Sequence, residues 1–171
     1  MPICVIMIGP PASGKTTFCS EQFHGYTHLS TYDIVIDLYG TSPDGKPRGY
    51  DEALKNSNKE TVIEVFNRKL AKAVERNDDI VIDRCNCTIS GRKALIEHIA
   101  FKNKKYKFIA VNMEVPLSIA LERTENNSGN VIPSGVIVKL YEKYQKPYIH
   151  EGYDAIYTID EHGNIVHKEE K

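Results

Sequence analysis

The feature that most constrains this chain is a short glycine-rich pattern near its N-terminus. The stretch ICVIMIGPPASGKTTF contains Gly9, four further residues, and then Gly14, Lys15 and Thr16, which is the phosphate-binding pattern G-x-x-x-x-G-K-T. The apolar run at residues 3–8 predicts a strand that is buried on both faces of a sheet. A turn between that strand and a helix places backbone N–H groups and the positive helix end where an anion can bind. The pattern therefore predicts an α/β protein that binds a phosphorylated ligand.

The loop offers both backbone and side-chain contacts to such a ligand. We expect its amides to hold the α- and β-phosphates of ATP, while the Lys15 ammonium reaches the β- and γ-phosphates. The Thr16 hydroxyl is expected to bind Mg²⁺. The expected nucleotide-binding residues are Gly9, Ala12, Ser13, Gly14, Lys15, Thr16 and Thr17. The alternative is a glycine turn with a purely structural role.

The rest of the chain alternates apolar and amphipathic segments, which predicts a three-layer α/β fold with about five parallel strands and helices on both faces. The strands are expected at residues 3–8, 26–30, 78–83, 106–114 and 153–159, and residues 162–167 as a terminal hairpin or extra edge strand. Helices are expected from Lys15 to about Phe23, over 32–40, over 58–76, after a cap at Ser90, from Pro116 to near Arg123, and between Pro133 and Pro147. Residues 40–52, rich in Gly, Pro and charge, are expected to form a surface loop. No repeat or linker interrupts the chain, so we expect one domain over residues 1–171.

Composition narrows the classes of partner. The formal net charge is -1, which argues against broad electrostatic attraction to nucleic acid, so any such contact should be local. No apolar run approaches the roughly 20 residues that span a bilayer, and the N-terminus lacks the basic start and length of a secretory signal, so we expect a cytoplasmic protein without a membrane partner. Four scattered cysteines do not suggest a disulfide framework, and the Cys85–Cys87 pair has no second pair at zinc-finger spacing. The six histidines form no recognisable pattern, and none is assigned a role.

Two aspartates lie at the carboxyl ends of predicted strands: Asp33 follows one, and Asp83 ends another. Because ligands of open parallel sheets bind beyond the carboxyl ends of the strands, both are expected in the same cleft. Asp33 could accept the proton of an acceptor hydroxyl, or it could only cap the helix that follows. Asp83 could hold Mg²⁺ indirectly or accept a hydrogen bond from the substrate hydroxyl. Arg84, Asn86 and Thr88 extend the same turn and are candidates for substrate contacts or for ordinary loop roles.

The order of several segments carries a resemblance that covers about residues 3 to 156. The segments GPPASGKTTF, STYDIVID, IVIDRCNCTISGRK, LERTENNSGNVIP and KPYIHEGYD resemble the small P-loop kinases typified by the 5'-kinase module of bacteriophage polynucleotide kinase. The first segment is shared by many nucleotide-binding families, so the specificity comes from the order and spacing of the whole set. The resemblance implies a P-loop kinase fold with a mobile lid and an activity that uses ATP and Mg²⁺.

The resemblance also implies roles at matching positions. The family's strand-end acid after the P-loop helix acts as general base, which implies Asp33 as a catalytic residue, although Tyr32 can be aligned there instead. The acid and asparagine of the family's D-x-T-N-like turn engage the substrate. They match Asp83 and Asn86, with Cys85 in place of the usual threonine.

The implied lid, about residues 124–132, departs from the family pattern. Arg123 matches an arginine at the helix-to-lid junction that would place positive charge on the transferring phosphoryl group, so it joins Lys15 and Asp33 as a catalytic candidate. A further lid arginine is missing, because Asn127 stands near its position. An arginine finger can be worth roughly 10³ to 10⁵ in rate, so its loss either is offset by Arg84 or indicates a different substrate.

The leading interpretation is ATP-dependent phosphorylation of the 5'-hydroxyl of DNA or RNA. Cations that could contact a phosphate backbone are Lys46, Arg48, Arg84, Arg92, Lys93, Lys102, Lys104, Lys105 and Lys107. A nucleoside, sugar or antibiotic kinase is the main alternative, and the low overall basicity favours it. The third interpretation is a module that binds ATP without transferring phosphate.

Overall fold

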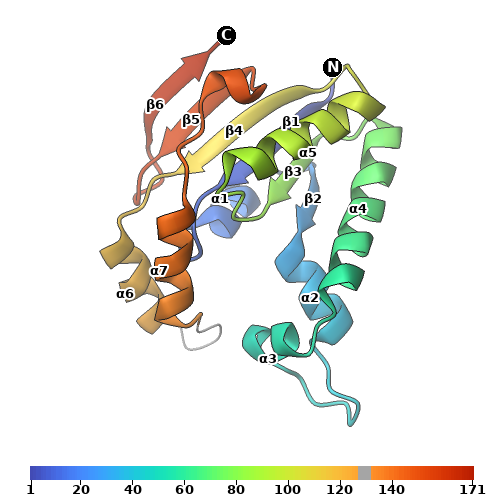
Figure 1. The fold of residues 1–171 in the computed structure, drawn as a ribbon, viewed down its shortest axis with the longest axis vertical. Helices are drawn as coiled ribbons and strands as arrows, with labels where there is room; N and C mark the ends of the chain where they lie inside the picture. The colour runs from blue at the N-terminus through green and yellow to red at the C-terminus, as the bar shows by residue number, and fades with distance from the viewer. Residues whose placement is uncertain (127–131) are drawn as a thin grey trace.

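Six strands form one sheet in the computed structural model, which describes residues 1–126 and 132–171 (Figure 1). The strands of the described chain, in the order in which they lie side by side, are β2 (Thr27–Ser30), β3 (Ile80–Asp83), β1 (Ile3–Ile8), β4 (Lys107–Met113), β5 (Ala155–Ile159) and β6 (Ile165–Glu170). The first five run parallel, and β6 runs antiparallel to β5. The predicted α/β fold with about five parallel strands and a terminal hairpin is therefore confirmed.

The strand order places the end of β1 at the centre of the sheet. The chain leaves β1 for the edge strand β2, returns to β3 beside β1, and then crosses to β4 on the other side of β1. The carboxyl ends of β1 and β3 are consequently adjacent, which is where open α/β sheets bind their ligands. In Figure 1 both chain termini lie at the opposite edge of the sheet.

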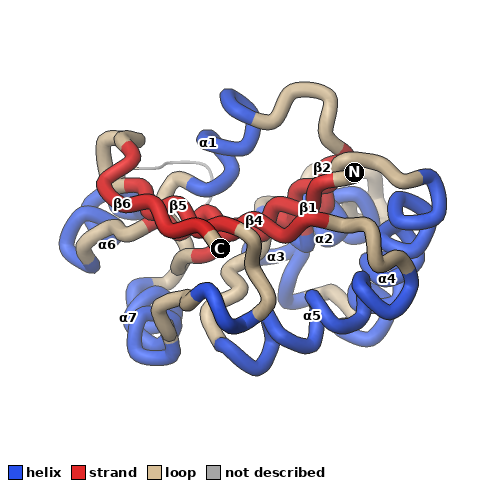
Figure 2. The backbone as a smooth tube through the Cα atoms, turned by 90° about the horizontal axis from the view of Figure 1, so that it is seen from above, coloured by secondary structure: helices blue, strands red, loops and turns tan. Residues whose placement is uncertain are grey.

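Helices cover both faces of the sheet. They are α1 (Lys15–Gln22), α2 (Thr31–Tyr39), α3 (Tyr50–Lys55), α4 (Lys59–Arg76), α5 (Ile89–Lys102), α6 (Leu117–Glu125), α7 (Ser134–Lys143) and the short 3-10 helix η1 (Ile149–Glu151). Seen from above, α1 lies on one face, and α4, α5 and α7 lie on the other (Figure 2). Among the described residues, no helix has both the length and the apolar character needed to cross a membrane.

The central strand β1 serves two hydrophobic layers, because successive side chains of a strand point to opposite faces. Ile6 and Ile8 belong to the larger cluster with α4 and α5, whereas Val5 and Met7 belong to the smaller cluster that includes Cys19 of α1. All four β1 side chains are at most 1% exposed. This two-sided burial explains why residues 3–8 form an unbroken apolar run.

Three local predictions differ from the structure. The helix α3 begins at Tyr50, inside the predicted surface loop, with two acidic residues in its first turn that complement the helix dipole. Thr88 rather than Ser90 caps α5, because its hydroxyl accepts a hydrogen bond from the Gly91 amide. The helix α7 ends at Lys143 and not at Pro147. The predicted lid at 124–132, with Asn127, falls largely on residues 127–131, which lie outside the described part of the chain.

Candidate active site

The glycine-rich loop leaves β1 in a conformation that only glycine adopts easily. Gly9 has φ +150° and Gly14 has φ +93°. A Cβ atom on Gly9 would lie 2.9 Å from Ser13 Oγ and 3.1 Å from Met113 Cβ, so the loop packs too closely there for any side chain. The Gly9 amide donates to the carbonyl of Cys85, 3.0 Å away, which ties the loop to the turn after β3.

Lys15 lies across its own loop. Its side chain is largely buried, with the residue 8% exposed, and its ammonium donates to the carbonyls of Gly9 and Pro10 at 2.8 and 2.7 Å and to Ser13 Oγ at 3.3 Å. These contacts hold a positive charge within the loop whose amides are expected to bind phosphate.

A chain of polar contacts connects this loop to both strand-end aspartates. The Thr16 hydroxyl donates to Asp83 Oδ2 at 2.7 Å, and His28 Nε2 lies 3.3 Å from the same oxygen. On its other side, His28 Nδ1 lies 3.5 Å from Asp33 Oδ2. The first turn of α1, strand β2, the end of β3 and the first turn of α2 thus bring a hydroxyl, an imidazole and two carboxylates together.

The surroundings shift the protonation of this cluster. Burial alone would raise the pKa of Asp83, but hydrogen bonds from His28 and Thr16 and the charge of Lys15 outweigh it and lower that pKa. The hydrogen bond to Asp83 raises the pKa of His28, against an opposing effect of burial and with support from the charges of Asp83 and Asp33. Sequence reasoning assigned no role to His28, because nothing in its spacing along the chain indicates the two carboxylates beside it.

Asp33 does not cap α2. The cap is Ser30, whose hydroxyl accepts a hydrogen bond from the Asp33 amide at 3.2 Å. The Asp33 carboxylate faces His28, and its side chain is 52% exposed. The carboxylate is therefore accessible to a substrate hydroxyl, as a general base must be.

The oxygen atoms of this cluster fit a hard divalent cation. Mg²⁺ prefers hydroxyl, carboxylate, phosphate and water oxygens. The Thr16 hydroxyl and the Asp83 carboxylate are in direct contact beside the glycine-rich loop. Thr16 and Asp83 are therefore the residues that would hold Mg²⁺ at this site.

The turn after β3 has a strong structural role. Asn86 has φ 46° and donates its amide to the Met7 carbonyl at 2.7 Å, and its own carbonyl accepts from Arg92 at 2.9 Å. The Arg84 guanidinium lies 4.8 Å from the centre of the Phe66 ring. Asn86 thus anchors the turn to β1, in addition to any contact with a substrate, while Arg84 stays exposed beside it.

This turn also borders a cavity of about 270 Å³, lined by residues 84–88 and by Leu140 and Lys143 of α7. Within it, a hydrogen bond from the Cys87 thiol lowers the pKa of Cys85, against the effect of burial and with help from the charges of Lys15 and Arg84. The cavity is open enough for a small group of an acceptor molecule.

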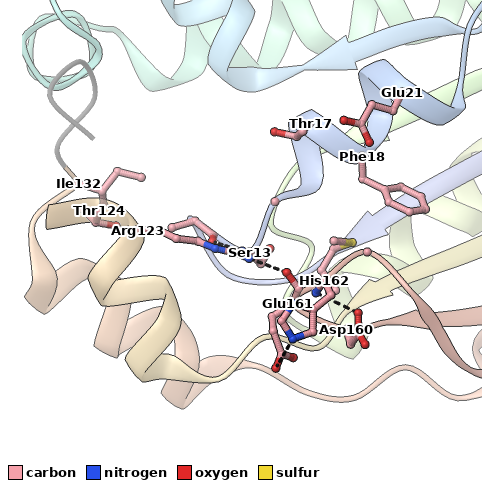
Figure 3. Close-up of a pocket in the computed structure, with 14 residues that line it drawn as sticks. Ser13, Thr17, Phe18, Glu21, Arg123, Thr124, Ile132, Asp160, Glu161 and His162 are labelled. Carbon is pink, nitrogen blue, oxygen red and sulfur yellow. Dashed lines mark hydrogen bonds and ion pairs between the residues drawn. The ribbon is translucent and has the colours of Figure 1, made fainter. Parts of the chain in front are cut away.

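A larger cavity of about 510 Å³ lies on the outer side of the loop (Figure 3). Its walls are the loop with the first turn of α1, the end of α6 including Arg123, and the turn between β5 and β6 at residues 160–163. This volume is typical of a site that binds a nucleotide-sized ligand. The β5–β6 turn was not a sequence candidate, because it contains no recognisable binding pattern.

Arg123 joins two walls of this cavity. Its guanidinium donates to the Ala12 carbonyl at 3.2 Å and to the Glu161 carbonyl at 2.7 Å, and Figure 3 shows it reaching from α6 toward Ser13. In this arrangement Arg123 fastens the loop to the β5–β6 turn. Contact with a transferring phosphoryl group stays a prediction.

Several cations proposed for nucleic acid are engaged or distant. Arg92 is 0% exposed and paired with Glu151, so it is corrected to a structural residue. Lys107 pairs in register with Ile3 at the start of β1, so it and the nearby Lys102, Lys104 and Lys105 lie at the edge of the sheet opposite the loop. Lys46 pairs with Asp44, and Arg48 with Glu52. Arg84 and Lys93 are the members of the set that are exposed beside the turn.

Comparison with known proteins gives a consistent assignment of the fold. A family described as "AAA domain" matches residues 4–147. The transcription factor bHLH140 of Arabidopsis thaliana is 24% identical over 160 residues, which are 90% of this chain and 15% of that protein. The chain therefore spans about a seventh of the length of this curated relative.

Solved structures with a similar fold include a kinase and a protein in complex with a nucleotide. Kti12 of Chaetomium thermophilum, in complex with ADP-AlF3, is 16% identical with a TM-score of 0.63, and the match covers 92% of this chain and 88% of that one. A gluconokinase of Sinorhizobium meliloti 1021 is 14% identical with a TM-score of 0.56, over 93% of this chain and 82% of that one. At this level of identity the likeness establishes a P-loop kinase-like fold.

Proposed function

Because this chain belongs to the AAA domain family of P-loop proteins, we propose that it is a phosphotransferase that moves the γ-phosphate of ATP to a hydroxyl group. The observation that carries the proposal is the run of contacts from Thr16 through Asp83 and His28 to Asp33. It joins the candidate phosphate-binding loop to an accessible carboxylate. A kinase needs both groups at one site, since one positions the donor and the other activates the acceptor.

The donor half of the reaction uses the loop. Its amides and Lys15 bind the triphosphate, and the cavity between α1, Arg123 and the β5–β6 turn receives the nucleoside. Thr16 and Asp83 would hold Mg²⁺, which would supply positive charge to offset that of the phosphates. Lys15 exchanges its contacts with the loop carbonyls for contacts with phosphate oxygens.

The acceptor half uses Asp33. Its carboxylate takes the proton of the acceptor hydroxyl as that oxygen bonds to the γ-phosphorus and the bond to ADP breaks. His28 orients the carboxylate through its Nδ1 atom, 3.5 Å from Asp33 Oδ2. The proton stays on Asp33 until the products leave.

The first candidate acceptor is the 5'-hydroxyl end of DNA or RNA. Tyr32, adjacent to Asp33 in α2, stacks on Tyr50 with ring centroids 4.5 Å apart, and it is 37% exposed. Aromatic faces of this kind stack on unpaired bases. Arg84, exposed at the turn after Asp83, supplies a cation for a backbone phosphate.

A small-molecule hydroxyl is the second candidate. The pairing of Arg92 with Glu151 and the position of the four lysines near β4 remove most of the cations that a long nucleic-acid groove would use. A nucleoside or sugar needs no such groove.

An acceptor screen with γ-labelled ATP and Mg²⁺ tests both. We expect label on 5'-hydroxyl oligonucleotides and not on 5'-phosphorylated ones of the same sequence, with Lys15→Ala as the inactive control. Label on nucleosides or sugars alone would replace the first acceptor with the second. Tight binding of ATP with no acceptor labelled would contradict the transferase proposal.

A further inference from the structure

We propose that Cys19, His28 and Asp83 form a binding site for Zn²⁺, and that Zn²⁺ bound there blocks phosphoryl transfer. The ligands come from α1, β2 and β3, on the face of the sheet that α1 covers. The metal binding is independent of the proposed function, whereas the block on transfer rests on it.

The three donor atoms are already close to a metal-binding arrangement. The Cys19 sulfur, a ring nitrogen of His28 and a carboxylate oxygen of Asp83 all lie within 4.8 Å of one another. His28 Nε2 and Asp83 Oδ2 are 3.3 Å apart. With bonds of about 2.0 to 2.3 Å, tetrahedral zinc holds its ligand atoms about 3.3 to 3.8 Å apart. The ligand atoms therefore need to approach one another by at most about 1 Å, which small side-chain rotations can provide.

A second carboxylate orients the histidine. His28 uses Nε2 toward the cluster, and its Nδ1 lies 3.5 Å from Asp33 Oδ2. Zinc-bound histidines commonly donate their other ring N–H to a carboxylate, which sets the tautomer and strengthens the metal bond. Asp33 stands in the position that this arrangement requires.

The set of ligands discriminates between metals. Thiolate and imidazole suit Zn²⁺, while Mg²⁺ takes oxygen ligands. Cys19 and Asp83 are 4% and 6% exposed, and the His28 side chain is 34% exposed. Water can thus reach the fourth coordination position on the histidine side.

Binding has a cost at the cysteine. Burial, together with the charge of Asp83 and against that of Lys15, raises the pKa of Cys19 to about 12. The thiol must lose its proton to the solvent when zinc binds, and the free energy of this deprotonation lowers the net affinity for the metal. In the absence of metal, Cys19 packs as an apolar side chain against α1's face of the sheet.

Occupation of the site removes groups that the transfer reaction uses. Asp83 accepts a hydrogen bond from the Thr16 hydroxyl, and His28 is the residue that orients the Asp33 carboxylate in the proposed reaction. A zinc ion on Asp83 and His28 would draw both away from those tasks. Zinc and the Mg²⁺-dependent reaction should therefore exclude each other.

Cobalt substitution tests the binding. The reduced 171-residue chain with Co²⁺ should show the thiolate-to-cobalt charge-transfer band and the visible bands of tetrahedral cobalt, and Zn²⁺ should abolish them. Cys19→Ser should lose the charge-transfer band, and His28→Gln should weaken Co²⁺ and Zn²⁺ binding at least tenfold. The second variant alters a partly exposed side chain, so it keeps the test decisive if Cys19→Ser does not fold.

The matched control is the other thiol pair near the loop. A Cys85→Ser/Cys87→Ser variant should keep the bands. Their loss in this control, their absence from the unaltered chain, or their persistence in His28→Gln would overturn the proposed site.

A transfer assay tests the block separately. Where an acceptor has been found, Zn²⁺ should inhibit the unaltered chain, and Cys19→Ala should raise the half-inhibiting concentration at least tenfold while transfer without zinc is unchanged. Binding of cobalt without inhibition by zinc would remove the regulatory half of the proposal. A protein with no transferase activity but with the cobalt bands would remove the proposed function and leave the metal site standing.

Discussion

The buried ion pair between Arg92 and Glu151 lends itself to a quantitative prediction. Both side chains are 0% exposed, and the guanidinium donates twice to the carboxylate at 2.7 Å. Glu151 also accepts the Tyr148 amide at 3.1 Å, and Arg92 donates to the Asn86 carbonyl at 2.9 Å. The substitution Glu151→Gln keeps the shape of the side chain and removes its charge.

The loss follows from the burial of the partner. Glu151→Gln leaves the Arg92 charge without a counter-charge inside the protein, and breaking a buried pair in this way costs about 3–5 kcal/mol. For a chain of this size, each kcal/mol lowers the Tm by about 2–4 °C. We therefore expect the Tm of Glu151→Gln to be about 6–20 °C lower.

Thermal unfolding followed by circular dichroism measures the effect. The control is Arg76→Ala, because Arg76 and Asp78 form an exposed pair with the similar N–O distance of 2.6 Å. Exposed pairs contribute little, since water screens both charges, so this variant should unfold at nearly the same temperature as the unaltered chain. A double variant, Arg92→Met with Glu151→Leu, should lose less stability than Glu151→Gln because it buries no charge.

The comparison of the two variants can refute the reasoning. If Glu151→Gln lowers the Tm no more than Arg76→Ala does, water reaches the pair in solution and the energetic argument is wrong. If Glu151→Gln is strongly destabilised, its ATP binding should weaken as well. Arg92 donates to the Asn86 carbonyl, and the carbonyl of the adjacent Cys85 accepts the Gly9 amide of the glycine-rich loop, so movement of Arg92 would disturb that loop.

Three further predictions concern single residues. Asp33→Asn should slow phosphoryl transfer about 10²- to 10⁴-fold and leave ATP binding nearly unchanged, measured by single-turnover labelling and by calorimetry; equal losses in both would mean a structural role. Gly9→Ala should weaken ATP binding at least tenfold and lower the Tm, because a Cβ atom would lie 2.9 Å from Ser13 Oγ; normal ATP affinity would show that the loop relaxes freely. Asn77 follows the last residue of α4 with φ 57°, a conformation that alanine adopts poorly and glycine adopts freely. Asn77→Ala should therefore lower the free energy of unfolding in urea by about 1 kcal/mol, whereas Asn77→Gly should change it less. Equal losses in the two variants would assign the effect to the hydrogen bond from Asn103.

The sheet and its loop were predictable because their signals are local. The apolar run at residues 3–8, the glycine spacing and the helical periodicity of residues 58–76 are each contiguous in the chain. The structure contains the corresponding strand β1, the turn at Gly9 and Gly14, and helix α4 (Lys59–Arg76). Errors occurred where local signals conflict. Residues 50–55 form a helix although the glycines and prolines just before them indicate a loop.

The site was predictable only in part. Asp33 and Asp83 were expected at one edge because each lies at or just after the end of a strand, and parallel strands end at one edge. The structure places both carboxylates beside His28. The capping alternative for Asp33 disappeared only when Ser30 was seen in that position. Arg92 could be assigned to a phosphate groove from its charge alone, since its partner Glu151 is 59 residues away.

The sequence alone therefore determined what depends on neighbouring residues: a buried strand, a glycine-rich loop and a helix, in an order that leads to a parallel sheet. The tertiary structure decided which distant groups meet. His28 lies between two aspartates because β2 pairs with β3, and Arg123 reaches the loop because α6 follows β4 on the other side of β1. Strand order and burial set these contacts, and neither quantity is encoded in the local spacing of residues.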